Sequence, residues 1–415
     1  GVSNRGGPFP NLDAYRGIGM IMVMTNHVAF SSNLRNKHEV LNTFFARFDL
    51  SIPVFFMVSG FLLFRPYAKS LLDDRPVPAT GPYLQNRALR ILPAYWAAMI
   101  GVFIWYGIPH VDVGGVFGMY PGGTIAFYAL MLQTFQASTV FAGYEAFDQA
   151  WSIGTEVTFY LLLPLLGLAL ARRTRGGSAE RSVKTLLALC AVLWAVAQVW
   201  RTGLVIAQPT WIASATFWLP ANIDFFAIGM AMATIEMRHR LGAPLPNPVA
   251  WLAARPWASW AIAAAIWLIV VNPFQWAYLD GLFVIRTNPL DFSEEYVAKQ
   301  FLYGFVGFFY LLPATFGPQH EGAIRRTLGS RPLAALGTIS LGFYLWHKAW
   351  LGQAESWTDA QPFNGDFLKL WVITFLGALL CGIASYAIVE RPFLRLKPAR
   401  SRRRAGDHQQ VKVPS

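Results

Sequence analysis

Residues 11–30 read NLDAYRGIGMIMVMTNHVAF, an apolar stretch that carries three ionisable side chains, Asp13, Arg16 and His27. The stretch has the length of a transmembrane helix, which needs about 20 mostly apolar residues to cross a hydrocarbon core. Ionisable groups are costly inside a bilayer, and they mark functional sites where they occur. The stretch therefore predicts a membrane helix with a chemical role.

Similar apolar stretches recur along the whole chain. Of its 415 residues, 55% are hydrophobic and 13% are charged, whereas soluble domains are about 25% charged. Eleven apolar segments can be delimited, at 12–32, 43–64, 84–106, 123–136, 151–171, 184–206, 217–236, 258–272, 299–317, 333–352 and 368–390. The sequence thus predicts an all-α polytopic integral membrane protein.

The segment 123–136 is too short to cross comfortably, and we interpret it as a re-entrant or interfacial helix. About ten transmembrane helices remain. With both termini cytoplasmic, the outer loops 107–150, 207–216 and 353–367 contain no Lys or Arg. If 123–136 crossed, the loop RRTRGGSAERSVK at 172–184 would lie outside, against the positive-inside rule.

The remaining bulk features concern charge, domains and cysteines. The net charge of +12 resides mostly in short loops, so it indicates membrane orientation rather than nucleic-acid binding. Residues 1–393 are assigned to one transmembrane domain and 394–415 to a basic, disordered cytoplasmic tail. Cys190 and Cys381 lie in apolar runs, which argues against a disulfide or a metal site. Without a recognisable cleavable signal peptide, we expect a multi-pass protein of the inner (plasma) membrane.

The three ionisable residues of the first segment share one helix face. Arg16 and His27 are eleven residues apart, about 1100° at 100° per residue, which leaves them within about 20° of each other. They are separated by about 16 Å along the axis, and Asp13 lies within about 60° of Arg16. The alternative is that Asp13 and Arg16 only end the helix and that His27 is hydrogen-bonded inside a bundle. Three such residues on one face favour a functional stripe.

Two further pairs lie in the cytoplasmic halves of the next helices. Ser59 and Gly60 form a small pair, which can simply let helices approach closely. Arg87 and Arg90 are three residues apart and therefore neighbours on one face. Membrane topology alone would explain them, but two guanidinium groups on one face also suit a phosphate.

Glu156 and His347 are expected at the same depth as His27, in the outer half of the membrane. Glu156 begins an inward helix and His347 ends an outward one. Their proximity to His27 is inferred from depth alone. Lys348 is expected to snorkel to the surface. The outer-loop charges are interpreted as a solvated face, with acceptor recognition as the alternative; they are Glu145, Asp148, Asp280, Arg286, Asp291, Glu294 and Glu295.

Taken together, these segments resemble the acyltransferase-3 family of membrane O-acyltransferases. The matching pieces, in order, are LDAYRGIGMIMVMTNH, FFMVSGFLL, RALRILPAYW, WSIGTEVTFYLLLPLL, ISLGFYLWH and VERPF, from about residue 11 to 393. The sequence departs from the family pattern at Ala14-Tyr15 and Gly342-Phe343, and neither departure removes a candidate catalytic group. Some members carry a fused extracytoplasmic SGNH domain. This sequence shows none, so we expect transfer to be completed within the membrane domain.

The resemblance implies transfer of a short acyl group, acetyl or succinyl, from cytoplasmic acyl-CoA to a hydroxyl of an extracytoplasmic glycan or glycolipid, without a metal. His27 would be the catalytic base, aided by Glu156 and His347, and Glu156 would hold the imidazole tautomer. The donor would be bound by Asp13, Arg16, Ser59, Arg87 and Arg90. The acceptor, with trehalose mycolates and arabinogalactan among the options, and direct transfer versus an acyl-histidine intermediate both stay open. Lys348 or Arg47 could meet an anionic acyl group.

The competing class is a transporter or flippase for a sugar or lipid, which ten crossings and scattered polar residues would also suit. Matching interrupted helices in corresponding halves, the usual sign of a transporter, are not recognised. A structural scaffold would leave the stripe from Arg16 to His27 unexplained.

Overall fold

The computed structural model describes residues 9–34, 38–108, 121–135, 145–271, 294–360 and 364–396. Within these ranges the chain is helical and contains no strand, only an isolated bridge between Ser32 and Gly365. The N-terminal half contains α1 (Pro10–Ser31), α3 (Glu39–Ala46), η1 (Arg47–Leu50), α4 (Ser51–Leu72), α5 (Thr80–Tyr106), α6 (Pro121–Ala129), η2 (Leu132–Phe135), η3 (Glu145–Ala150), α8 (Trp151–Thr174) and α9 (Ala179–Ala207). The C-terminal half contains α10 (Ile212–Ala215), α11 (Leu219–Arg240), α12 (Asn247–Ala254), α13 (Pro256–Val271), α14 (Glu294–Thr315), α15 (Gly322–Leu328), α16 (Arg331–Trp357), α17 (Phe367–Ala384), the π-helix η5 (Ser385–Glu390) and α18 (Arg391–Arg395).

Seven of the described helices are long and apolar enough to cross a membrane, and the bent pair α12–α13, which turns by 103°, raises that number to eight. Two other long helices, α1 with 22 residues and α16 with 27, fall outside this set. Both carry several polar residues, including His27 and His347. The two long helices outside the set therefore hold two of the three candidate catalytic residues, and the third, Glu156, lies in α8.

The short helix expected at 123–136 is divided in two. Helix α6 has nine residues, about 14 Å at 1.5 Å per residue, and η2 follows a left-handed residue, Met131, with φ 61°. The Tyr95 hydroxyl donates to the Tyr128 carbonyl at 2.7 Å and the Trp96 indole donates to the Ala129 carbonyl at 3.0 Å. Helix α6 is therefore too short to cross and is fastened to α5.

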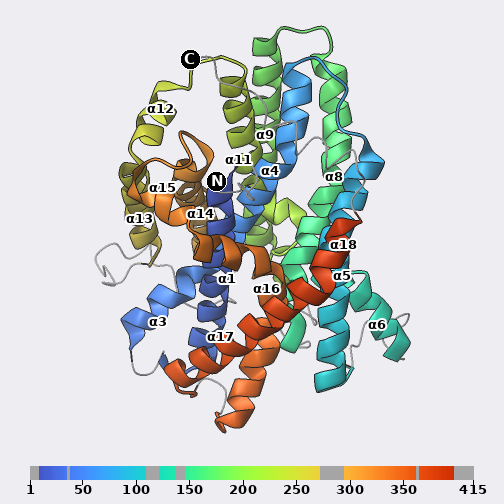
Figure 1. Ribbon diagram of the computed structural model, residues 1–415, viewed down its shortest axis with the longest axis vertical. Helices are drawn as coiled ribbons and strands as arrows, with labels where there is room; N and C mark the ends of the chain where they lie inside the picture. Colours follow the sequence, from blue (N-terminus) through green and yellow to red (C-terminus); the bar gives the residue numbers. More distant parts are fainter. Residues whose placement is uncertain are drawn as a thin grey trace.

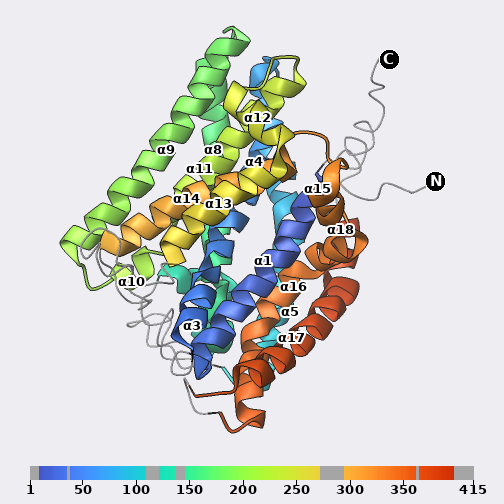
Figure 2. The same ribbon diagram turned by 90° about the vertical axis from the view of Figure 1, so that its left-hand side faces the viewer.

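The first helix lies inside the bundle. Both views place α1 between neighbours, with α16 alongside it, while Figure 2 shows α9 and α17 on opposite flanks (Figures 1 and 2). Helix α1 packs against α16, α4, α17 and α14. An amphipathic surface helix would need only one apolar face, but a central one must accept neighbours on several sides. In this packing Asp13, Arg16 and His27 stay partly exposed, and 38% of the Asp13 side chain is accessible.

Two glycines set how closely α1 and α16 approach. A Cβ at Gly337 would overlap the backbone of Asp13, and a Cβ at Gly17 would meet Leu336. Small residues at such a crossing let membrane helices pack backbone to backbone. Ten residues beyond these glycines, on both helices, stand His27 and His347. The two helices therefore run parallel and in register, which brings the histidines to one level.

A second close contact joins α4 to α11, where a Cβ at Gly60 would overlap the backbone of Phe226 and one at Gly229 the backbone of Met57. The packing interpretation of Gly60 is therefore confirmed. Next to it, the fully buried ion pair of Arg201 and Asp224 joins α9 to α11, with N–O distances of 2.6 and 2.8 Å. This pair was not predicted from the sequence.

Three remaining expectations concern the cysteines, the C-terminal tail and the loop before α14. Cys190 and Cys381 are free thiols. The last helix continues to Arg395, two residues past the expected domain boundary, and residues 397–415 of the tail lie outside the described residues. The outer-loop residues Asp280, Arg286 and Asp291 lie outside them as well.

Candidate active site

His27 and His347 are in direct contact. Nδ1 of His27 lies 2.8 Å from Nε2 of His347, and the two rings are parallel within 4°. His347 is fully buried, whereas His27 is half-buried. Two of the three residues proposed as catalytic from the sequence are thus brought together.

The partners of these rings determine where their protons lie. Nδ1 of His347 is 2.6 Å from the carbonyl oxygen of Tyr344, and a carbonyl can only accept, so this nitrogen carries the proton. Nε2 of a neutral His347 is then an acceptor, and Nδ1 of His27 must donate to it. It follows that Nε2 of His27 is unprotonated when both rings are neutral, which makes it a base.

The hydrogen-bond chain to His27 begins at the Tyr344 carbonyl, and residues of η3 and α8 hold this part of α16 in place. The Tyr344 hydroxyl donates to the Gln149 carbonyl at 2.5 Å, and the Ser152 hydroxyl donates to Tyr344 at 2.8 Å. The Gln149 amide donates to the Leu345 carbonyl at 2.8 Å. The turn of α16 that carries His347 is therefore fixed by contacts with η3 and α8. A proton chain needs such support to keep its geometry.

The α1 side of the contact is fixed as well. The Asn26 amide donates to the carbonyls of Ala46, at 2.9 Å, and Phe45, at 3.3 Å. The hydroxyl of Thr25 accepts from the Trp371 indole at 2.9 Å. These contacts set the rotation of α1 immediately before His27. The next residue is Arg47, the other cation considered for an anionic acyl group, and it is buried, with 4% of it exposed.

Glu156 has a different partner from the one the sequence suggested. Its carboxylate accepts a hydrogen bond from Ser59 and interacts electrostatically with Tyr160. In the described part of the chain it makes no contact with His27 or His347, so the position expected for an orienting carboxylate is taken by His347. Ser59 was expected in the cytoplasmic half of its helix, so this contact does not agree with the common depth expected for Glu156 and the two histidines.

The candidate donor-binding residues converge next to Glu156. Nη1 of Arg16 lies 3.6 Å from the Asp13 carboxylate, and the Arg16 charge interacts with those of Arg90 and Glu156. Arg87 and Arg90 both interact electrostatically with Tyr160. Arginines from α1 and α5 thus share one polar region. Like charges repel, so an anion between them would be favourable.

A second carboxylate faces this region and was not singled out from the sequence. Glu390 is 6% exposed, accepts from Ser385 at 3.4 Å and interacts with the charge of Arg90. It lies in the π-helix η5, and π-helical turns are frequent at functional sites. Its only sequence signal was the VERPF motif.

An ion pair lies next to the histidine pair. Nζ of Lys348 lies 3.5 Å from the Asp148 carboxylate, and its side chain is 15% exposed. Its charge acts on both His27 and His347. Lys348 is therefore close enough to influence the histidine pair.

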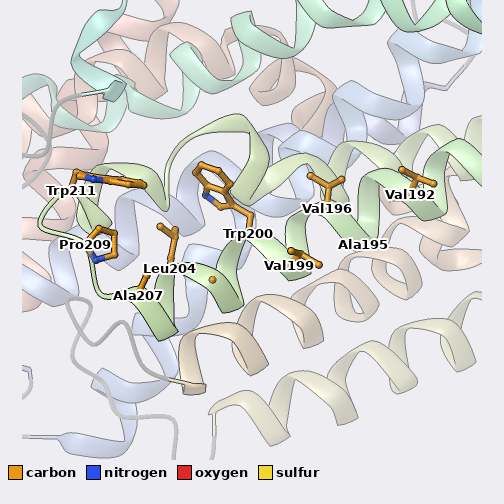
Figure 3. Close-up of a pocket in the computed structure, with 10 residues that line it drawn as sticks. Val192, Ala195, Val196, Val199, Trp200, Leu204, Ala207, Pro209 and Trp211 are labelled. Atoms are coloured by element: carbon orange, nitrogen blue, oxygen red, sulfur yellow. The ribbon is translucent and has the colours of Figure 1, made fainter.

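An apolar groove of about 590 Å³ lies elsewhere, along α9 and the segment that follows it, and Trp200, Trp211 and valines line it (Figure 3). It contains none of the candidate residues. Its lining residues include the well-exposed Val192 and Val199, as expected of a helix face in contact with lipid. We assign it no catalytic role.

Comparison with known proteins points to one family. The family model described as acyltransferase domain, of the acyltransferase-3 type, matches residues 9–390. The chain is 23% identical to nodulation protein 10 of Rhizobium leguminosarum bv. viciae, over 95% of each chain. No solved structure matches.

Proposed function

Since this chain belongs to the acyltransferase-3 family, we propose that it is a membrane O-acyltransferase that uses cytoplasmic acyl-CoA, acetyl-CoA or succinyl-CoA, as donor. The acceptor is a hydroxyl of an extracytoplasmic glycan or glycolipid, and the protein works in the inner (plasma) membrane. The observation that carries the proposal is the hydrogen-bond chain from Tyr344 through His347 to His27.

In this proposal Nε2 of His27 takes the proton of the acceptor hydroxyl. The resulting oxygen attacks the thioester carbonyl, the new C–O bond forms, and the C–S bond breaks. The imidazolium then returns the proton to the CoA thiolate. General-base assistance of this kind typically accelerates a reaction by about 10² to 10⁴. An acyl-histidine intermediate would also form on Nε2, because Nδ1 is engaged with His347.

The donor lies along α1. The arginines at positions 16, 87 and 90 hold the phosphate groups, since guanidinium groups bind phosphate bidentately. Arg16 and His27 are about 16 Å apart along the helix axis, a span that the pantetheine arm can cover. Ser59 and Glu156 line the path between them. The thioester then reaches the histidine pair from the cytoplasmic side.

Ten crossings with both termini cytoplasmic complete the proposal, and helix directions support it. The seven apolar helices, the bent pair, α1 and α16 make ten. In that order α1 and α16 both run outward, in agreement with their parallel packing. Helices α4 and α8 both run inward in that order. Ser59 contacts Glu156 and Tyr67 contacts Gly167, the pattern expected of two parallel helices. A crossing at α6 would make both pairs antiparallel.

The proposal is tested with purified protein in nanodiscs, supplied separately with acetyl-CoA and succinyl-CoA. We expect thiol release that requires a membrane glycolipid extract, together with isotope-labelled acyl groups recovered on the extract. Stabilisation of the protein against heat by CoA alone is also expected. Movement of a sugar or lipid across the bilayer without CoA, and no thiol release with either donor, would instead indicate a transporter.

Lys348 is proposed to favour an anionic acyl group, because its charge lies close to both histidines. Replacing Lys348 by Gln is expected to lower the use of succinyl-CoA relative to acetyl-CoA. An unchanged ratio would remove this assignment, and Arg47 would become the residue to replace next.

A further inference from the structure

Four buried polar atoms near the cytoplasmic end of the bundle have no hydrogen-bond partner in the part of the chain that the structure describes. They are the hydroxyls of Tyr67 and Tyr83, Oδ1 of Asn86 and Nε of Arg87. Leaving a buried polar atom unsatisfied costs about 1–3 kcal/mol. Native structures therefore contain few of them, and a group of them calls for a ligand or solvent.

The four residues that carry these atoms lie together, and we call Tyr67, Tyr83, Asn86 and Arg87 the wall. Tyr83, Asn86 and Arg87 stand at positions i, i+3 and i+4 of α5 and hence on one face. The ring of Tyr67 in α4 meets that of Tyr83 edge to face, with centroids 5.9 Å apart. On the α8 side, a Cβ at Gly167 would overlap the Tyr67 ring. Two aromatic rings and an amide thus lie together where α4, α5 and α8 meet.

The wall is connected to the proposed donor path. Tyr83 interacts electrostatically with Arg87 and with Glu156. In the outward direction of α5, Arg90 follows Tyr83 by seven residues, about 10 Å. The order from the cytoplasm is therefore the tyrosine–asparagine wall, then the arginines, then the histidine pair. CoA has the same order of parts, with its nucleoside, its phosphates, its pantetheine arm and its thioester in sequence.

We propose that Tyr67, Tyr83 and Asn86 bind the adenine nucleoside of the CoA donor, an inference that rests on the proposed function. An amide matches the adjacent acceptor and amino group on an adenine edge, a pairing that proteins use repeatedly. Aromatic rings offer surfaces against which a base can pack. The wall accordingly makes the protein select CoA thioesters over thioesters of phosphopantetheine alone, the group carried by acyl carrier proteins.

The test compares initial rates of thiol release from acetyl-CoA and from S-acetyl-4′-phosphopantetheine, which keeps the arm and thioester but lacks the nucleoside. For Tyr83→Phe and Asn86→Asp we expect KM for acetyl-CoA to rise about three- to tenfold, the effect of one neutral hydrogen bond. KM for the truncated donor should stay unchanged. Tyr67→Phe is expected to behave like Tyr83→Phe.

Thermal unfolding without donor supplies the second measurement. Because the hydroxyls of Tyr67 and Tyr83 have no partner, their removal should leave Tm unchanged or raise it slightly. The matched control is Tyr95→Phe in α5. The Tyr95 hydroxyl donates to Tyr128 and accepts from Gln133, so this change should lower Tm and leave the donor preference intact.

The possible failures are distinct. Wild-type protein that releases thiol from neither donor would contradict the proposed function itself. Wild-type activity with a preference for acetyl-CoA that is identical in Tyr67→Phe, Tyr83→Phe and Asn86→Asp would overturn only the nucleoside assignment. Those polar atoms would then be satisfied by water.

Discussion

Nδ1 of His27 lies 2.8 Å from Nε2 of His347, and His347 is in turn bonded through Nδ1 to the carbonyl of Tyr344. A backbone carbonyl here performs the task that a carboxylate performs in many catalytic triads, which is to fix the tautomer of a histidine. It does so through a second imidazole. The arrangement carries no negative charge in the membrane, where an unpaired carboxylate would be costly.

In the proposed mechanism, His347 is therefore a positioning residue for His27. Replacing it by Ala is expected to lower kcat for acceptor-dependent thiol release about 10- to 100-fold, the usual effect of losing a partner that orients a functional histidine. KM for the donor should remain close to wild type. His347→Gln should recover part of the rate, because its amide oxygen can accept from Nδ1 of His27. An equal loss in both variants, accompanied by a raised KM, would contradict this role.

The close crossing of α1 and α16 sets the distance between the histidines. Gly337→Ala is expected to destabilise the protein by about 1–3 kcal/mol and to reduce activity, because its Cβ overlaps the backbone of Asp13. Gly203→Ala in α9 is the control, since nothing lies near its Cβ, and it should stabilise the helix by about 0.5–1 kcal/mol. Thermal unfolding in detergent would measure both. Equal shifts would show that the crossing does not restrict side-chain size.

The arginines are predicted to bind the donor phosphates. Arg90→Gln should raise KM for acetyl-CoA about 10- to 100-fold, the range expected for loss of a charged hydrogen bond. Arg90→Lys should recover only part of the affinity, because a lysine cannot bind phosphate bidentately. Arg173→Gln, at an exposed position on the end of α8, serves as the control and should leave KM unchanged. A KM for Arg90→Gln that also stays at the wild-type value would contradict phosphate binding at Arg90.

The buried ion pair of α9 and α11 is predicted to act on stability alone. Asp224→Ala leaves the Arg201 charge buried without its partner and should cost about 3–5 kcal/mol. Replacing both residues by Leu should be far less damaging, since apolar pairs often match or exceed buried ion pairs in stability. Variants that fold should keep their donor KM. A double variant as unstable as Asp224→Ala would show that the geometry, not the unpaired charge, is responsible.

Most chemical groups of the candidate site could be selected from the sequence because charged residues inside apolar segments are conspicuous. Asp13, Arg16 and His27 could be placed on one face by helical periodicity alone. The contact with His347 depends on the register of two helices 320 residues apart, and Gly17 and Gly337 determine that register. A pattern within one helix contains no information about such a register.

The same limit explains the partner of Glu156. Its contact with Ser59 depends on how α8 packs against α4, and the position of Glu156 within its own helix could not predict that packing. Tyr67, Tyr83 and Asn86 could not be singled out, because polar and aromatic residues at helix ends are ordinary in membrane proteins. Only the absence of a hydrogen-bond partner for these atoms in the described ranges distinguishes them.

The most direct test of the central claim is acceptor-dependent release of CoA by His27→Ala, compared with wild type in nanodiscs. The mechanism predicts that release falls to the uncatalysed background, while CoA still raises Tm by the wild-type amount because the arginines are intact. A folded His27→Ala protein that still transfers the acyl group at the wild-type rate would contradict the role of His27 as the base.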